Sequence, residues 1–152
     1  MAESVSDSVL NSIYFAFTGD RLLSLGSLPG SEAQQIRAVH QTVRQQLQAS
    51  GWLYCVNNWW WQGACVQASE NRAMYLAPHL PWNWTITSCT HFTKMHTFNV
   101  MYYTSANGNT YYWRVDNYVA ATILIDYLGT SLPWWMYKTL GNNEYVGTKP
   151  GR

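Results

Sequence analysis

Three side chains near the middle of the chain have the functional groups of an acyl-transfer site: the thiol of Cys65, the imidazole of His96 and the carboxylate of Asp116. A thiolate attacks carbonyl carbon atoms, and an imidazole one hydrogen bond from the sulfur takes up and returns the proton. A carboxylate on the other ring nitrogen fixes the tautomer of the imidazole and stabilises its charged form. This chemistry needs neither a metal ion nor a cofactor, so we expect neither.

The sequence around Cys65 favours a reactive thiol, because a helix is predicted to begin near Gly63 and to carry Cys65 in its first turn. The positive end of a helix dipole, together with an imidazolium, lowers the pKa of a thiol from about 8.5 by several units. Backbone N–H groups around Cys65, with the side-chain amide of Gln62 or Asn58, are the candidates for holding an oxyanion. Two alternatives stay open: Cys55 as the nucleophile, and a buried Cys65 with a purely structural role.

His96 and Asp116 open and close the stretch HTFNVMYYTSANGNTYYWRVD, which is typical of two strands joined by a turn. Side chains alternate between the two faces of a strand, so the length of the turn decides whether imidazole and carboxylate share a face. A two-residue Asn-Gly turn separates them. A three-residue turn, with Gly108 in the left-handed conformation, puts Asp116 opposite Phe98 and next to His96. We expect the three-residue turn, because it gives the charged Asp116 a partner.

Helices are expected in the first part of the chain, over about residues 1–76. Apolar residues recur at helical spacing from Val5 to Phe17, and a second helix is predicted after Ser31, which can cap it. The apolar stripe of this second helix consists of Ile36, Val39, Val43 and Leu47. A third predicted helix carries Cys65. The aromatic stretch WLYCVNNWWW, which precedes the third helix, is left unassigned.

Strands are expected over about residues 85–128, where β-branched and aromatic residues dominate. The stretch VAATILIDYL fits either a buried strand or a helix. Residues 132–140 are predicted to form a short helix, with Ser131 before it and Gly141 after it. Helices followed by strands, without regular alternation, predict an α+β fold in which N-terminal helices pack on a small antiparallel sheet. A chain of 152 residues, 1–152, is expected to form a single domain.

The composition limits the partners of the chain. Only 11% of its residues are charged and the formal net charge is +1, so it offers no field for a phosphate backbone and nucleic acid is not expected as a partner. No apolar stretch of about 18 residues and no basic leader are present, so we expect no transmembrane segment and no classical signal peptide. The expected location is the cytoplasm, or a target cell reached by a non-classical route.

The three cysteines cannot all pair with one another, which leaves at least one free thiol.

The motifs GACVQA, HTFNV and WRVDN resemble those of the papain-like and transglutaminase-like superfamily of cysteine enzymes, and most closely its bacterial papain-fold toxin branch. In that branch a helix carries the cysteine, and a strand that begins H-x-F-N-V is followed by a strand that ends in V-D. The match covers about residues 62–117. The resemblance implies a papain-like core and attack by a thiol on a glutamine carboxamide or a peptide bond, as in proteases, deamidases and transglutaminases. It also implies a protein or peptide substrate and a setting as a toxin or effector.

The tryptophans support a second hypothesis from another functional class. The residues expected to form the substrate-binding walls are Trp59, Trp60, Trp61, Trp82 and Trp84. A non-catalytic module for carbohydrate or protein recognition, with inert cysteines, would use the same aromatic surface, since indole rings supply large contact area at little entropic cost. Three consecutive tryptophans cannot all face inward from one regular element, so at least one is expected at the surface as part of an interface.

The stretch CTHFTKMH contains a candidate set of zinc ligands, namely Cys89, His91 and His96. A separation of five positions puts the two histidines on opposite faces of a strand, or about 140° apart on a helix, so one regular element cannot direct both at one ion. Zinc sites also show more closely spaced ligand pairs than this stretch does. No metal site is therefore expected.

Overall fold

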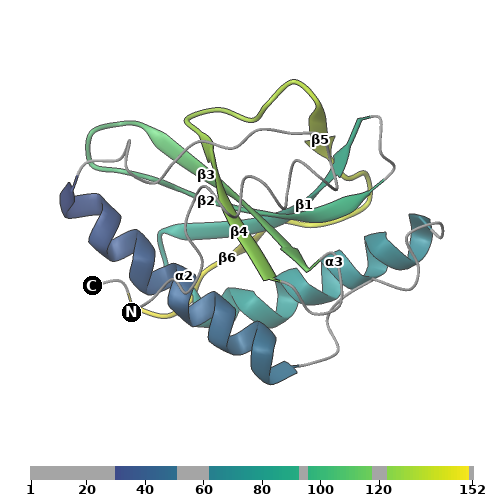
Figure 1. The fold of residues 1–152 in the computed structure, drawn as a ribbon, viewed down its shortest axis with the longest axis horizontal. Coiled ribbons are helices and arrows are strands. Elements are labelled where there is room, and N and C mark those ends of the chain that lie inside the picture. The colour runs from purple at the N-terminus through teal and green to yellow at the C-terminus, as the bar shows by residue number, and fades with distance from the viewer. Residues whose placement is uncertain (1–29, 51–61, 93–95, 118–122, 151–152) are drawn as a thin grey trace.

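A computed structural model describes residues 30–50, 62–92, 96–117 and 123–150. These ranges contain two α-helices followed by six strands, all of which belong to one antiparallel sheet, so the described chain has an α+β fold. Figure 1 shows both helices on the same side of the sheet. Neither described helix is long and apolar enough to cross a membrane. The helix expected over residues 5–17 and the aromatic stretch 52–61 lie outside the described residues.

Helix α2 spans Gly30–Ser50 and confirms the second predicted helix, although it already includes Ser31 instead of beginning after it. Its predicted apolar stripe is buried against the sheet and consists of Ile36, Val39, Val43 and Leu47. Near the C-terminal end of the helix, Nη1 of Arg44 donates a hydrogen bond of 2.8 Å to the carbonyl oxygen of Ile123. Near the N-terminal end, the carboxylate of Glu32 accepts a hydrogen bond from the hydroxyl of Tyr103. Polar contacts thus fasten both ends of α2 to the sheet.

Helix α3 spans Gln62–Leu76 and confirms the predicted helix that carries Cys65. Its buried residues recur every three or four positions and consist of Cys65, Ser69, Arg72, Ala73 and Leu76. The helix packs across strands β1 and β2. A short 3-10 turn, η3 (Ala77–His79), connects it to β1. Because this connection is tight, α3 runs antiparallel to β1.

The strands confirm the sheet that was expected between residues 85 and 128 and extend it. They are β1 (Trp84–His91), β2 (Thr97–Thr104), β3 (Thr110–Asn117), β4 (Ile123–Gly129), β5 (Met136–Lys138) and β6 (Tyr145–Val146). Their order in the sheet is β4-β3-β2-β1-β5, and β6 also pairs with β1. The stretch VAATILIDYL, which fitted either a strand or a helix, contains all of β4 except Gly129.

The two faces of the sheet carry separate cores. On the helix side, α2 and α3 pack against a cluster that is rich in aromatic rings, including Trp84, Tyr103 and Trp113. The rings of Trp84 and Tyr103 are stacked with their centroids 4.7 Å apart. On the opposite side, the second cluster is built from Cys89, Phe98, Val100, Leu128 and Met136. The central strands are therefore buried on both faces.

The turn between β2 and β3 has three residues, as predicted. The N–H of Ser105 donates to the carbonyl oxygen of Asn109 over 2.8 Å, and Gly108 between them has a φ of +92°. From this turn the register runs to Asn99 opposite Val115, so its continuation places Asp116 opposite Phe98. The confirmed register means that even-numbered residues of β2 and β3 share one face of the sheet.

The prediction of a short helix over residues 132–140 is wrong. This segment instead contains β5, which pairs with the end of β1, with Met136 opposite His91 and Lys138 opposite Cys89. The helix prediction relied on local signals such as Pro133 and Gly141. Such signals carry no information about a strand edge elsewhere in the chain, here the edge of β1 that needs a partner. Backbone hydrogen bonds to that edge and burial of Met136 outweigh the local preference for a helix.

Replacing Gly108 by Ala is expected to lower the free energy of unfolding by about 1 kcal/mol. The cost comes from the positive φ alone, because a Cβ at this position would meet no atom within 4 Å. Gly108→Asn is the matched control and should cost less, since asparagine tolerates this conformation better than alanine. Urea unfolding of the three proteins measures both effects. Equal stability of the wild type and Gly108→Ala would contradict the strain argument.

Candidate active site

His96 and Asp116 form a buried pair at one end of the sheet. Nε2 of His96 lies 2.9 Å from Oδ2 and 3.2 Å from Oδ1 of Asp116. Both side chains are almost completely buried. The register explains the contact, because Asp116 stands opposite Phe98 and His96 lies two positions before Phe98 on the same face. The predicted meeting of this imidazole with this carboxylate is confirmed.

The contact with Asp116 assigns the two ring nitrogens of His96. A carboxylate accepts hydrogen bonds, so Nε2 of His96 carries the proton that is donated to Asp116. In the neutral ring, Nδ1 is then the basic nitrogen and lies on the other side of the imidazole from the carboxylate. Asp116 thus fixes both the orientation and the tautomer of His96.

Asp116 is held in its charged form despite its burial. Burial alone would raise the pKa of this carboxyl, but the positive charge of His96, its hydrogen bond, and the guanidinium groups of Arg114 and Arg72 oppose that effect. The net result is a pKa below its usual value. A buried carboxylate that stays ionised is able to stabilise an imidazolium beside it.

Arg114 is a member of this buried group that the sequence analysis did not assign to the site. Its Nε lies 3.9 Å from Oδ2 of Asp116. The guanidinium carbon lies 3.8 Å from the ring centre of Phe98 and 4.9 Å from that of Trp135, so the cation is held between two aromatic rings. Asp126 stands opposite Arg114 on β4 and is also buried. Side chains of the WRVD segment alternate between the two faces of the strand, which puts Arg114 on the same face as Asp116. This alternation was the signal in the sequence that could have assigned Arg114 to the site.

A buried polar contact fixes α3 against the sheet. Nε of Arg72 donates to Oδ1 of Asn99 over 2.5 Å, and Nδ2 of Asn99 donates to the carbonyl oxygen of Ser69 over 2.9 Å. The same Nδ2 also donates to the carbonyl oxygen of Thr87 on β1 over 3.1 Å. Asn99 therefore joins α3, β1 and β2, and it fixes the position of α3 along its axis.

This contact also locates Cys65 along the sheet. Cys65 precedes Ser69 by one turn, about 6 Å along the helix axis. Since the C-terminal end of α3 leads to the start of β1, its first turn lies toward the other end, where β1 finishes and β2 begins. Figure 1 shows the first turn of α3 and the end of β1 on the same side of the molecule. This is also the end of the sheet at which His96 and Asp116 meet, and the Cys65 side chain has no exposed surface there.

The thiol is carried by the helix layer, whereas the buried pair is carried by the sheet. Val115 lies in the core beneath the helices, so its neighbour Asp116 projects from the other face. His96 is on that other face too, because its ring lies 5.9 Å from that of Phe98 in the second core. Cys65 stands on the buried stripe of α3, on the helix side. The thiol and the pair thus come from different layers, and both are placed at the end of the sheet where β1 finishes and β2 begins.

The second described cysteine, Cys89, is buried in the core away from the helices. Burial raises the pKa of the Cys89 thiol to about 12, so it is protonated and unreactive near neutral pH. His91 ends β1 and His96 comes just before β2, and a backbone hydrogen bond of 2.8 Å joins them, so the two histidines do not belong to one regular element. Within the described ranges, no three His, Cys, Asp or Glu side chains are grouped closely enough to hold a metal ion.

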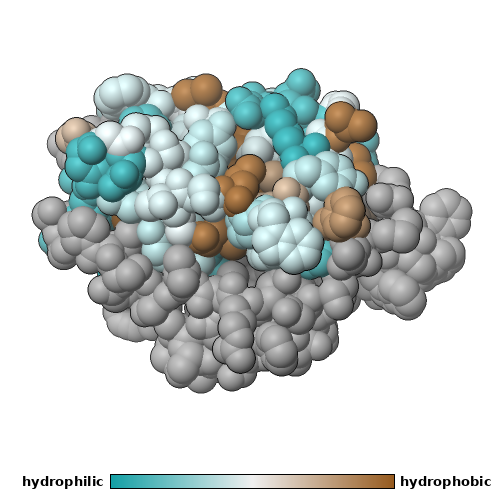
Figure 2. All heavy atoms as spheres, turned by 90° about the horizontal axis from the view of Figure 1, so that it is seen from above, coloured by the Kyte–Doolittle hydropathy of each residue, from teal (hydrophilic) through white to brown (hydrophobic). Residues whose placement is uncertain are grey.

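The aromatic residues proposed as substrate-binding walls have different surroundings. Trp82 is 64% exposed, whereas Trp84 is buried and belongs to the core beneath the helices. Trp134, Phe92 and Leu140 are also exposed. Figure 2 looks onto the sheet from the side away from the helices and shows apolar side chains as separate spots among pale, nearly neutral ones. Cys55, Asn58 and the three consecutive tryptophans lie outside the described residues, as does the side chain of Gln62.

Comparisons with protein-family models, with curated proteins and with solved structures found no match to this chain.

Replacing Asp116 by Asn is expected to lower the free energy of unfolding by roughly 3 kcal/mol at neutral pH, because it removes the buried negative charge that His96 and Arg114 face. The folded-state pKa of Asp116 lies below the unfolded value of about 3.9, so its contribution is present above that pH. The contribution is lost as the pH falls through the folded-state pKa. The stability difference between wild type and variant should therefore shrink in acid.

Urea unfolding between about pH 7 and about pH 3 measures this difference. Glu144→Gln is a suitable control, because Glu144 pairs with Lys138 over 3.2 Å while both side chains are about half exposed. Such a surface pair contributes at most about 1 kcal/mol and is screened by salt. A difference between wild type and Asp116→Asn that stays constant across this pH range would contradict the assignment of the buried charge.

Proposed function

We propose that this chain is a cysteine-dependent acyl-transfer enzyme that acts on a glutamine carboxamide or a peptide bond of a protein or peptide. The observation that carries the proposal is the buried His96–Asp116 pair, formed through Nε2 in the predicted register. The resemblance of GACVQA, HTFNV and WRVDN to papain-fold and transglutaminase-like enzymes supports it. By the same resemblance, the chain would work as a toxin or effector.

The proposed reaction assigns one role to each side chain. Nδ1 of His96 takes the proton of the Cys65 thiol, and the sulfur forms a bond to the substrate carbonyl carbon. The imidazolium returns this proton to the departing ammonia or amine, and a thioester between Cys65 and the substrate remains. Water or an acceptor amine then loses a proton to Nδ1 and attacks the thioester, which frees the thiol. Asp116 stabilises the imidazolium in both halves of the reaction.

The placement of α3 supports the thiol as the nucleophile. A cysteine in the first turn of a helix is stabilised as the thiolate by the unpaired N–H groups there. The same N–H groups, with the amide of Gln62 or Asn58, are the proposed donors to the oxyanion. The fully buried position of Cys65 means that a substrate reaches the sulfur only when the surrounding chain opens.

A second candidate, a non-catalytic binding module, is favoured by two observations. The Cys65 side chain has no exposed surface, as is common for structural cysteines. Two tryptophans, Trp82 and Trp134, have 64% and 82% of their surface exposed, which suits contact with a ligand or partner. In this case the His96–Asp116 pair would serve stability alone.

Alkylation distinguishes the two candidates. If Cys65 is the nucleophile, iodoacetamide should modify it faster than it modifies free cysteine near neutral pH, and mass spectrometry of digested protein locates the adduct. Cys89 is the internal control and should stay unmodified in the folded protein, because burial raises its pKa to about 12. A Cys65 that reacts no faster than free cysteine would count against the enzyme and in favour of the binding module.

Turnover provides the second test. Incubation with glutamine-containing peptides, with and without hydroxylamine, should give deamidated, cleaved or hydroxamate products that mass spectrometry separates. Replacing Cys65 by Ser or His96 by Ala is expected to reduce the rate at least about 100-fold. Cys89→Ser is the matched control and should keep the rate of the wild type. Products that form equally well in Cys65→Ser would exclude the thiol mechanism.

A further inference from the structure

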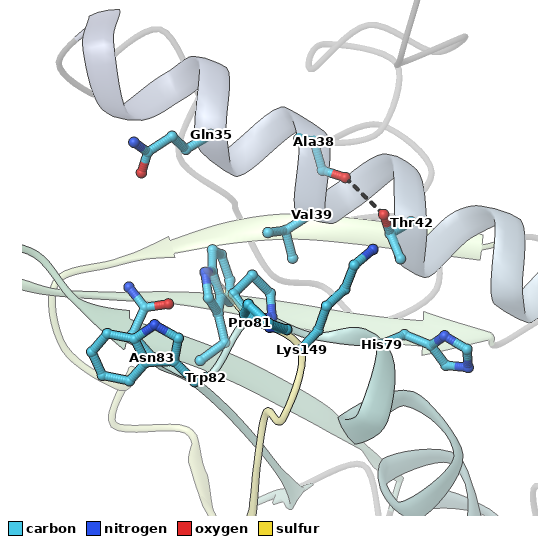
Figure 3. A pocket seen from close by; sticks show the side chains of 11 residues that line it. Gln35, Ala38, Val39, Thr42, His79, Pro81, Trp82, Asn83 and Lys149 are labelled. Atoms are coloured by element: carbon cyan, nitrogen blue, oxygen red, sulfur yellow. Dashed lines mark hydrogen bonds between the residues drawn. The ribbon is translucent and has the colours of Figure 1, made fainter. Parts of the chain in front are cut away.

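A groove between α2 and the start of β1 lies at the other end of the sheet from the candidate active site. It has a volume of about 480 Å³, within the range of small-molecule sites. Its walls come from α2, from η3 and the residues after it, and from the C-terminal segment around Lys149, as Figure 3 shows. Trp84 lines this groove and is seven residues before His91, so about 23 Å of strand separates the two sites.

The floor of the groove is fixed by backbone contacts. The N–H of Gly147 donates to the carbonyl oxygen of Trp84 over 2.7 Å, and the N–H of Lys149 donates to that of Leu80 over 3.0 Å. A Cβ on Gly147 would lie 2.0 Å from the carbonyl oxygen of Pro81, so no other residue fits in this place. The segment that carries Lys149 is thus held in one position against the start of β1, and the groove is preorganised.

The polar side chains around the groove are two amides, a hydroxyl, the imidazole of His79 and the ammonium of Lys149. Gln35 and Asn83 offer amide groups, each with both a donor and an acceptor, and Thr42 offers a hydroxyl oxygen. Lys149 is a cation, and no carboxylate is among the residues that line the groove. Within the described part of the chain, no ion pair of the Lys149 ammonium is found. Figure 3 shows this side chain extending from the floor toward Thr42 of α2.

Trp82 supplies an exposed aromatic face at the rim of the groove. This residue is 64% exposed, and it also borders a second hollow lined by Thr85, Tyr102 and Thr104. An indole ring with a polarised face packs well against the C–H face of a sugar ring. Amide and hydroxyl groups beside such a ring match the hydroxyl groups of a carbohydrate, and a single cation matches a carboxylate.

We propose that this groove binds an acidic saccharide, with one sugar ring stacked on Trp82 and a carboxylate paired with Lys149. A phosphate ligand suits the groove less well, because phosphates are usually bound by several cations or by N–H groups at a helix start. The proposal names a site and a ligand for the binding-module candidate, and it does not require the thiol chemistry of Cys65.

Isothermal calorimetry with two tetrasaccharides tests the proposal on the full chain. One probe alternates glucuronate with N-acetylglucosamine, and the other contains N-acetylglucosamine alone. The acidic probe should bind with a Kd of about 1 mM or tighter, and its affinity should fall as salt is added. Trp82→Ala is expected to weaken its binding at least about tenfold, and Lys149→Met should remove the preference for the acidic probe.

Trp134→Ala is the matched control, because Trp134 is even more exposed than Trp82 but follows Pro133 near β5, away from the groove. This variant should bind the acidic probe as the wild type does. Absence of saturable binding of either probe, or equal binding by wild type and Trp82→Ala, would overturn the proposal. Equal affinity for both probes would overturn the assignment of Lys149. Calorimetry measures binding alone, so failure here leaves the acyl-transfer proposal standing, and a reactive Cys65 would not exclude saccharide binding in the groove.

Discussion

A carboxylate removed from water costs several kcal/mol unless its surroundings replace the lost hydration. Asp116 is such a buried carboxylate. His96 at 2.9 Å and Arg114 at 3.9 Å replace its lost hydration. The register between β2 and β3 must keep this arrangement. A shift of one residue between β2 and β3 would turn Asp116 toward the apolar core beneath the helices and move Val115 to the charged face. The turn that contains Gly108 prevents this shift, because its three residues fix which side chains share a face.

The two faces of the sheet therefore differ in the kind of side chains that they bury. The helix side is filled mainly by rings and aliphatic chains, and Trp113 there contacts Trp84, Tyr103 and Tyr127. The chain has nine tryptophans and eleven tyrosines but few charged residues, so aromatic rings fill space that leucine fills in most proteins. The other side holds Arg114 between Phe98 and Trp135, close to the buried carboxylate. Asn99 joins the helix layer to the sheet, since its amide contacts both Ser69 and Arg72 of α3.

Features set by local periodicity could be predicted from the sequence. The buried stripe of α2, the bounds of α3 and the pairing of β2 with β3 depend on residue spacing and turn length, which are visible along the chain. Features that depend on contacts between distant parts of the chain could not be predicted from the sequence. Residues 136–138 join β1 although their own pattern favours a helix, and Trp135 contacts Arg114 only because of that pairing. The side of the sheet on which α3 packs could not be predicted either, because spacing along the chain does not determine it.

The outer edge of β1 is completed by two segments that are far away in the chain, with Thr90 paired to Tyr137 and Ile86 paired to Tyr145. The pairs β1–β2, β2–β3 and β3–β4 join consecutive strands and are available early during synthesis on the ribosome. The edge of β1 must wait for about fifty further residues beyond its own end. Until then the nascent chain presents an unpaired strand edge that contains three threonines, and such an edge is a known starting point for association between chains. Chaperone dependence during translation is the expected cost of this topology.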